Sequence, residues 1–240
     1  MPELVPSQSE QDYLKAIYHL THGEAKEQTG PAALAEWLGF SCASATNMVK
    51  KLTERGLVTH SPYHGVALTE TGTKVALEVL RHHRLLETYL SERLGVPWER
   101  VHAEADRLEH ALSEDLEARL DAALGYPTTD PHGAPIPTKE GVIVALATQR
   151  LWHVAPGSTV IVAEVADEDA ALLTYVADLG LVPGATVDVL AKAPFDGPLH
   201  IRVGGSEYAL GETVMRAVSV SVPTPVPASP QEKGKKRKEA

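Results

Sequence analysis

The stretch HAEADRLEH brings four potential metal ligands close together in the sequence. An α-helix turns by about 100° per residue, so side chains three or four residues apart share one of its faces. On such a helix, one arc of about 100° contains His102, Asp106, Glu109 and His110. Arg107 points to a different face, so the acids are not simply paired with a neighbouring cation. Two imidazoles and two carboxylates suit divalent Mn, Fe, Co, Ni or Zn, and the spacing therefore predicts a transition-metal site.

Further candidate ligands lie outside this stretch. His83 and Glu87 form a pair four residues apart on the helix predicted before it, and Asp12 is a candidate from a distant segment. A lone His/Glu pair at this spacing is commonly just a solvated helix surface, so the prediction of a metal depends on the four-residue face.

The same motifs argue against catalysis. The order HAEADRLEH differs from the H-E-x-x-H arrangement of zinc proteases, in which two histidines flank a general base. The sequence contains neither a glycine-rich phosphate loop nor a nucleophile elbow. A metallohydrolase would also need an open coordination position beside a base. We therefore expect a protein that is not an enzyme.

Composition bounds the class of protein. The 43% hydrophobic content supports a buried core. Cys42 is the single cysteine, so no intramolecular disulfide can form, which is typical of the reducing cytoplasm. The N-terminus lacks a secretory pattern and no run of about 18 apolar residues occurs, so we expect no membrane span. A net charge of −10 argues against indiscriminate nucleic-acid binding.

A pattern of three helices and a hairpin precedes the metal-ligand motifs. Caps and apolar spacing predict helices from Ser7, from Pro31 and from Ser41, followed by short strands at 57–59 and 66–68. This order is that of a winged helix-turn-helix.

The third of these helices carries the side chains that could read DNA. Polar residues near its start can reach base edges, whereas the lysines and Arg55 further along suit phosphate contacts. The candidate DNA-binding residues are Ser41, Ala43, Ser44, Thr46, Asn47, Lys50, Lys51 and, on the wing, Tyr63. A protein-interaction module is the alternative, and the polar start of the helix favours DNA over it.

The remaining pattern changes from helical to β along the chain. Helices are predicted from Thr69 to Leu94, from about Trp98 to Leu112 and from Ser113, and alternating strands with one short helix follow. The fold class is therefore mainly α with a small SH3-like β-barrel. The predicted parts are the winged helix-turn-helix (1–75), a helical metal-binding and dimerisation domain (76–140), a linker (141–155), the SH3-like domain (156–222) and a disordered proline- and lysine-rich tail (223–240).

Four ordered motifs carry a resemblance to a known family. They are EQDYLKAIY (10–18), RHHRLLE (81–87), RVHAEADRLEH (100–110) and HGAPIP (132–137). Together they resemble the diphtheria toxin repressor family of metal-dependent regulators, including its manganese-sensing branch, over residues 8 to about 222.

The resemblance implies a homodimer that binds a palindromic operator in double-stranded DNA, with one winged helix per subunit. It also implies two metal positions. The primary site would be formed by Asp12, Asp106, Glu109 and His110. The ancillary site would be formed by His83, Glu87 and His102 and completed from the SH3-like domain by Asp169 or, alternatively, by Glu168.

Two departures from the family pattern bear on the metal. Asp12 and Asp106 stand where iron-type members carry sulfur ligands, which favours Mn(II) over Fe(II). Lys15 stands where manganese-type members often place a glutamate, which opposes a close two-ion arrangement. We therefore expect a manganese-dependent DNA-binding regulator of metal-homeostasis genes. An iron-dependent regulator and a metal-binding protein-interaction adaptor are the alternatives.

Overall fold

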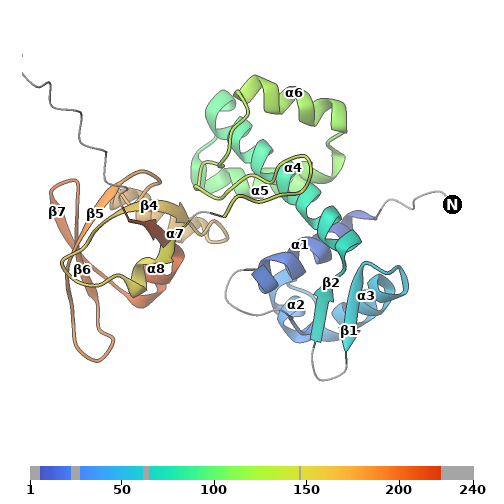
Figure 1. Ribbon diagram of the computed structural model, residues 1–240, viewed down its shortest axis with the longest axis horizontal. Coiled ribbons are helices and arrows are strands. Elements are labelled where there is room, and N and C mark those ends of the chain that lie inside the picture. Colours follow the sequence, from blue (N-terminus) through green and yellow to red (C-terminus); the bar gives the residue numbers. More distant parts are fainter. Residues whose placement is uncertain (1–5, 23–27, 62–64, 146, 223–240) are drawn as a thin grey trace, which may run out of the picture.

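The computed structural model describes residues 6–22, 28–61, 65–145 and 147–222, which form three bodies (Figure 1). The N-terminal domain consists of α1 (Gln8–His22), α2 (Pro31–Leu38), α3 (Cys42–Glu54), β1 (Val58–Ser61) and β2 (Gly65–Leu68). The helical domain consists of α4 (Glu70–Leu94), α5 (Trp98–Leu108), a 3₁₀ turn (Glu109–Ala111) and α6 (Glu114–Leu124). Tyr63, the wing candidate, and the predicted tail at 223–240 lie outside the described residues.

The N-terminal domain is the predicted winged helix-turn-helix. Gly39 adopts a left-handed conformation (φ 70°) that ends α2, and the Ser41 side chain accepts a hydrogen bond from the Ser44 N–H at the start of α3. The two strands pair antiparallel, with Val58 opposite Leu68. Leucine, valine and alanine side chains of all three helices and both strands form its buried core. The N-terminal half of α3 presents its exposed side chains on the face that points away from this core.

The long helix α4 connects this domain to the helical domain. Thr69 caps its start, and Gly95 ends it in a left-handed conformation. The helix predicted to run to Leu112 is shorter, because α5 ends at Leu108 and the chain tightens into the 3₁₀ turn. The extended Leu112 then leads to Ser113, whose side chain caps α6. Glu109 and His110 therefore lie on a turn, not on the helix face used to predict them.

The third body is a single antiparallel six-stranded sheet in the order β3-β8-β4-β5-β6-β7. Its strands are β3 (Gln149–Arg150), β4 (Thr159–Val165), β5 (Thr186–Lys192), β6 (Leu199–Val203), β7 (Ser206–Leu210) and β8 (Val218–Ser221). A 3₁₀ turn (Leu151–His153) and two helices, α7 (Ala170–Asp178) and α8 (Glu212–Ala217), complete this β domain. Alternating valine, leucine and isoleucine side chains fill its core, as expected for a small barrel.

The β domain begins earlier than the sequence pattern indicated. Gln149 and Arg150 pair with β8, and Leu151 and Val154 belong to the core, so residues predicted as linker are part of the sheet domain. Periodicity did not separate β3, which has two residues, or α8, which has six. It also missed β7, because the burial of its side chains does not alternate. None of the helices in the described ranges is long and apolar enough to cross a membrane.

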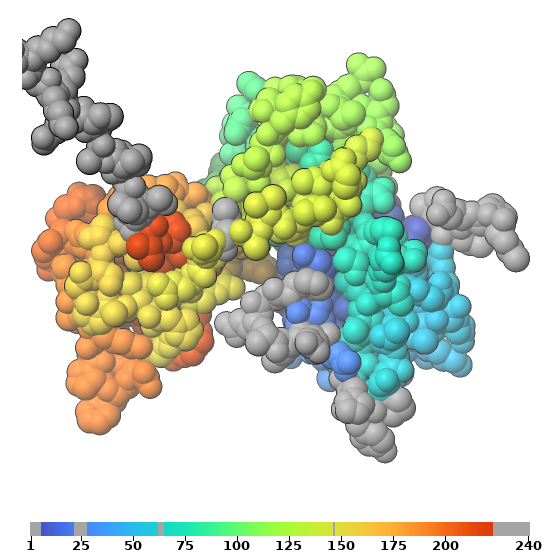
Figure 2. All heavy atoms as spheres, in the orientation of Figure 1, coloured from blue at the N-terminus to red at the C-terminus, as the bar shows by residue number. Residues whose placement is uncertain are grey.

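The irregular segment after α6 holds the β domain against the helical domain. The Val165 N–H of β4 donates to the His132 carbonyl at 2.9 Å. At Gly133 (φ +89°) an added Cβ would lie 1.9 Å from the Ala163 carbonyl oxygen, so only glycine permits this approach. Trp98, at the start of α5, packs on the core of the β domain. In Figure 2 the β domain (yellow to red) forms a separate lobe beside the rest of the molecule.

Candidate metal centre

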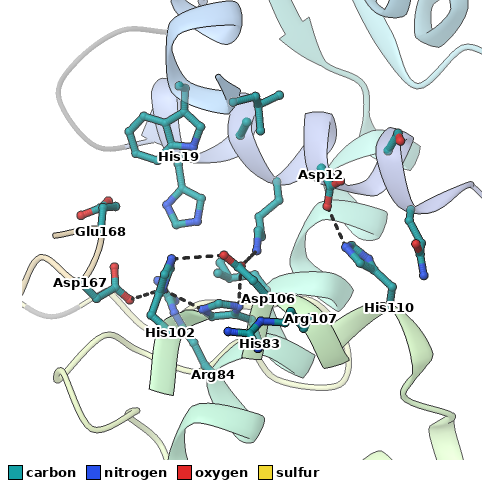
Figure 3. A pocket seen from close by; sticks show the side chains of 17 residues that line it. Asp12, His19, His83, Arg84, His102, Asp106, Arg107, His110, Asp167 and Glu168 are labelled. Carbon is teal, nitrogen blue, oxygen red and sulfur yellow. Dashed lines mark hydrogen bonds and ion pairs between the residues drawn. The ribbon is translucent and has the colours of Figure 1, made fainter. Parts of the chain in front are cut away.

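A cavity of about 720 Å³ opens where the three domains meet. Its wall combines α1 and α2 of the N-terminal domain, α4 and α5 of the helical domain, and the segment after β4. Figure 3 shows candidate ligands at this cavity from all three domains. They are Asp12, His83, His102, Asp106, His110 and Asp167. The cavity therefore places ligands from distant parts of the chain together.

The first cluster, which we name the α1 cluster, consists of Asp12, Glu109 and His110. Asp12 Oδ1 lies 2.7 Å from His110 Nε2, and Glu109 Oε1 lies 3.5 Å from the same nitrogen. His110 Nδ1 lies 2.7 Å from Gln11 Oε1. Donation of the Nδ1–H to Gln11 would leave the Nε2 lone pair facing the carboxylates, which is the tautomer a metal ligand needs. Burial raises the pKa of Asp12, while His110 beside it acts in the opposite direction.

Asp106 is not grouped with Asp12 and His110 as predicted, and lies instead with His83 and Glu109. The Lys15 ammonium donates to Asp106 Oδ1 at 2.8 Å and to both Glu109 oxygens at 2.7 and 2.9 Å. His83 Nδ1 also approaches Asp106 Oδ1, at 3.3 Å. Burial opposes the charge of Asp106, but His83 and Lys15 outweigh it and hold the pKa of this carboxyl well below its usual range. Lys15 thus places a positive charge between the two acids.

The second cluster, the ancillary cluster, consists of His83, Glu87, His102 and Asp167. Glu87 Oε1 lies 3.0 Å from His83 Nε2 and 3.2 Å from His102 Nδ1. Asp167 Oδ2 lies 3.4 Å from His102 Nδ1. Burial works against protonation of His102, but Asp167 and Glu87 raise its pKa to about 10. Two imidazoles and two carboxylates from α4, α5 and the segment after β4 converge here.

The acid supplied by the β domain is Asp167, not Asp169 as predicted. Asp169 is exposed, and its carboxylate accepts hydrogen bonds from the Ala171 and Leu172 N–H groups at the start of α7. These bonds hold the Asp169 carboxylate at the helix terminus, and Asp169 belongs to none of the candidate metal-binding groups. Glu168, the alternative, lines the cavity but is not a member of either cluster.

The start of α3 presents the candidate DNA-binding side chains to solvent. Ser41, Ala43, Ser44, Thr46, Asn47 and Lys50 are all exposed. Lys51 is also exposed, but its ammonium lies 3.4 Å from Glu10 of α1. Arg55, which was expected to contact phosphate, donates to Glu10 at 2.6 Å. The polar face of α3 is therefore free to approach a partner, while its last turn is tied to α1.

Three family models match successive parts of the chain. Residues 6–66 match the iron-dependent repressor N-terminal DNA-binding domain, residues 69–138 match the iron-dependent repressor metal-binding and dimerisation domain, and residues 149–222 match the FeoA domain. The iron-dependent repressor IdeR of Mycobacterium tuberculosis is 36% identical over 222 residues, covering 87% of this chain and 94% of the relative. The chain belongs to the diphtheria toxin repressor family. It is thus a metal-dependent, DNA-binding transcriptional regulator, and we call it the regulator below.

Solved structures of this family superimpose on the regulator. One described as a manganese-dependent transcriptional repressor in complex with manganese is 38% identical, covers 89% of the regulator and 99% of its own chain, and has a TM-score of 0.84. The manganese regulator SloR is 30% identical, covers 89% and 98% respectively, and has a TM-score of 0.76. The fold class predicted from the sequence is confirmed, including the small β domain.

Two further candidate ligands of the regulator were missed by the sequence reasoning. Asp130 and His132, from the irregular segment after α6, form an alternative group with Glu87 and Asp167. They stand in the stretch D-P-H, at the edge of one of the motifs that carried the family resemblance. Polar residues on an irregular but buried segment are a signal of function that spacing rules for helices do not detect.

The chemistry of these groups fits a divalent cation. Among the described residues, the candidate metal-binding groups contain only oxygen and nitrogen donors. One oxygen of Glu87, one of Asp130 and Nδ1 of His132 are buried and make no hydrogen bond within the described ranges. Burial together with the neighbouring Glu87 and Asp167 carboxylates raises the pKa of Asp130 well above its usual value. A cation would relieve both this repulsion and the missing contacts.

Proposed function

We propose that the regulator is a manganese-responsive repressor that acts as a homodimer in the cytoplasm on genes of metal homeostasis. The observation that carries the proposal is the 2.7 Å contact between Asp12 of α1 and His110 of the 3₁₀ turn, beside Glu109. This contact links the first helix of the DNA-binding domain to the metal-binding domain. The manganese-dependent relative and the hard oxygen-rich donor set support Mn(II).

The residues of the α1 cluster would couple metal binding to DNA binding. When bound, the divalent ion supplies one positive centre that neutralises the facing carboxylates. Asp12, Glu109 and His110 would hold it, with Gln11 orienting the His110 ring. Asp12 then restrains α1 relative to the helical domain. In a dimer, this restraint would set the separation of the two α3 helices for successive major-groove half-sites, about 34 Å apart or a multiple.

The residues of the ancillary cluster would connect the β domain to the same helices. His83 and Glu87 lie on α4, His102 lies on α5, and Asp167 follows β4. A shared ion at this cluster, or at the alternative group with Asp130, would hold the β domain in place. Both groups contain Glu87 and Asp167, so these two carboxylates would hold the ion in either arrangement.

The proposed function is tested by sequence-selective, metal-dependent DNA binding. Randomised duplexes are selected on the wild-type regulator with Mn(II), with Fe(II) under anaerobic conditions, and with a chelator. We expect a palindromic sequence to be enriched with Mn(II) and lost with the chelator, and binding to weaken steeply with salt. Enrichment with Fe(II) alone would make iron the effector. Enrichment that is equal with and without metal contradicts the proposal.

Lys15→Met is expected to increase the amount of Mn(II) that the regulator binds. The substitution removes the ammonium that lies between Asp106 and Glu109, and leaves these two acids with His83 as the remaining contact from a candidate ligand. We expect one more Mn(II) ion per subunit in equilibrium dialysis than in wild type. Lys74→Met, at an exposed lysine paired with Glu70, is the control and should match wild type. An unchanged stoichiometry in Lys15→Met would show that the ammonium does not replace an ion.

A further inference from the structure

Glu10 is a buried carboxylate whose contacts exceed those of a helix cap. It is only 2% exposed, in the first turn of α1. The N–H and hydroxyl of Ser7 donate to Glu10 Oε2 at 2.7 and 2.9 Å, and the bond from the N–H is the glutamate half of a capping box. A local contact at the start of α1 accounts for these two bonds. It does not require the third, in which the Arg55 guanidinium donates to the same oxygen at 2.6 Å.

The contact with Arg55 attaches α1 to the far end of the recognition helix α3. Arg55 is the C-cap residue that directly follows α3, and Lys51, one turn earlier, lies 3.4 Å from the other Glu10 oxygen. Near the opposite end of α3, the Tyr13 ring of α1 stacks on Phe40, which precedes the Ser41 cap, with centroids 6.2 Å apart. The first two turns of α1 therefore contact α3 near both of its ends.

The same two turns of α1 carry the contacts to the metal-binding domain. Asp12 contacts His110, and Lys15 contacts Asp106 and Glu109. Glu10 and Asp12 are two residues apart, so a shift of α1 relative to the helical domain moves both. The bond from the Arg55 guanidinium to the Glu10 carboxylate, at 2.6 Å, joins two groups that carry opposite charges, and such hydrogen bonds are stronger than those between neutral groups.

We propose that Glu10 is the positioning residue that transmits the metal-set position of α1 to the recognition helix, through its ion pair with Arg55. This inference rests on the proposed function, because it assumes that metal controls DNA binding. Glu10 itself contacts no candidate ligand, and its contacts with α3, to Arg55 and Lys51, lie at the end of the helix opposite Ser44. It joins α1 and α3 into one unit, so that a restraint at Asp12 becomes a restraint on Ser44 and Asn47.

The test measures the metal-dependent gain, defined as DNA affinity with Mn(II) divided by DNA affinity with a chelator, on the duplex selected with wild type. Direct loss of a phosphate contact lowers both affinities and cancels in this ratio. We expect Glu10→Gln and Arg55→Met each to reduce the gain about tenfold, the scale of one hydrogen bond between charged groups. The double variant should lose no more than either single one, because both act through one link.

Two controls separate coupling from folding and capping. Ser7→Ala removes the hydroxyl that donates to Glu10 at the start of α1 and leaves the Ser7 N–H and Arg55 bonds, so it should keep the wild-type gain. Mn(II) affinity without DNA should be the same in all variants, because none changes a candidate ligand. A gain in Glu10→Gln and Arg55→Met equal to that of wild type overturns the inference. A wild type whose DNA affinity ignores Mn(II) overturns the proposed function instead.

Discussion

Asp12→Asn is expected to remove most of the metal-dependent gain in DNA affinity, which for coupled sites amounts to roughly 5–150-fold. The substitution keeps the shape of the side chain but removes the negative charge that faces His110 and Glu109. Asp12 is the single candidate ligand that α1 contributes to the described clusters. Its loss therefore disconnects the N-terminal domain from the metal. Fluorescence anisotropy of the selected duplex, titrated with and without Mn(II), measures the gain.

The matched control for this variant is Asp196→Asn. Asp196 is an exposed acid in the turn between β5 and β6, distant from the cavity, and asparagine tolerates its left-handed backbone (φ 53°). This control should keep the full gain and the same thermal unfolding as wild type. Should Asp12→Asn respond to Mn(II) as strongly as the control does, α1 is not the element through which metal acts.

Glu87→Gln is expected to remove most of the stabilisation that Mn(II) gives to the folded regulator through the ancillary cluster. Glu87 is fully buried and belongs to both alternative groups, with His83 and His102 or with Asp130 and His132. A ligand at one hundred times its dissociation constant stabilises a protein by about 2.7 kcal/mol. Chemical denaturation of wild type and variant, each with and without Mn(II), gives the difference.

The metal-free arms of this experiment are essential. Glutamine also weakens the contacts of Glu87 with His83 and His102, so the variant should be less stable than wild type even without metal. Glu92→Gln, at an exposed position on the same helix α4, is the control for helix propensity and charge. Equal Mn(II)-induced stabilisation in Glu87→Gln and wild type would exclude Glu87 as a ligand.

Features set by local sequence were predictable. The winged helix-turn-helix follows from the caps at Ser41 and Thr69 and from the glycine that ends α2, because each acts within one turn of chain. Helix spacing indicated only the pair His83 and Glu87, and the family resemblance added His102 to it. The structure brings these three side chains together. The roles of these residues as ligands stay predictions, as do the predicted domain boundaries other than the start of the β domain.

Features that depend on contacts between distant segments were not predictable. Asp167 and Asp169 are two residues apart, and which one faces His102 depends on where β4 ends and α7 begins. Asp130 and His132 reach Glu87 only because Gly133 allows the segment to lie against β4. The sequence shows the S-x-x-E capping pattern at Ser7 and Glu10, but not that Arg55, 45 residues away, binds the same carboxylate.

The central claim is that one coupling free energy links the metal at α1 to DNA at α3. Linkage requires that DNA tighten metal binding by the factor by which metal tightens DNA binding. The most direct measurement is calorimetric titration of Mn(II) into the wild-type regulator alone and into its complex with the selected duplex. We predict that the duplex increases Mn(II) affinity by the same roughly 5–150-fold factor that Mn(II) gives to DNA affinity. An Mn(II) affinity that is identical with and without DNA would contradict the account.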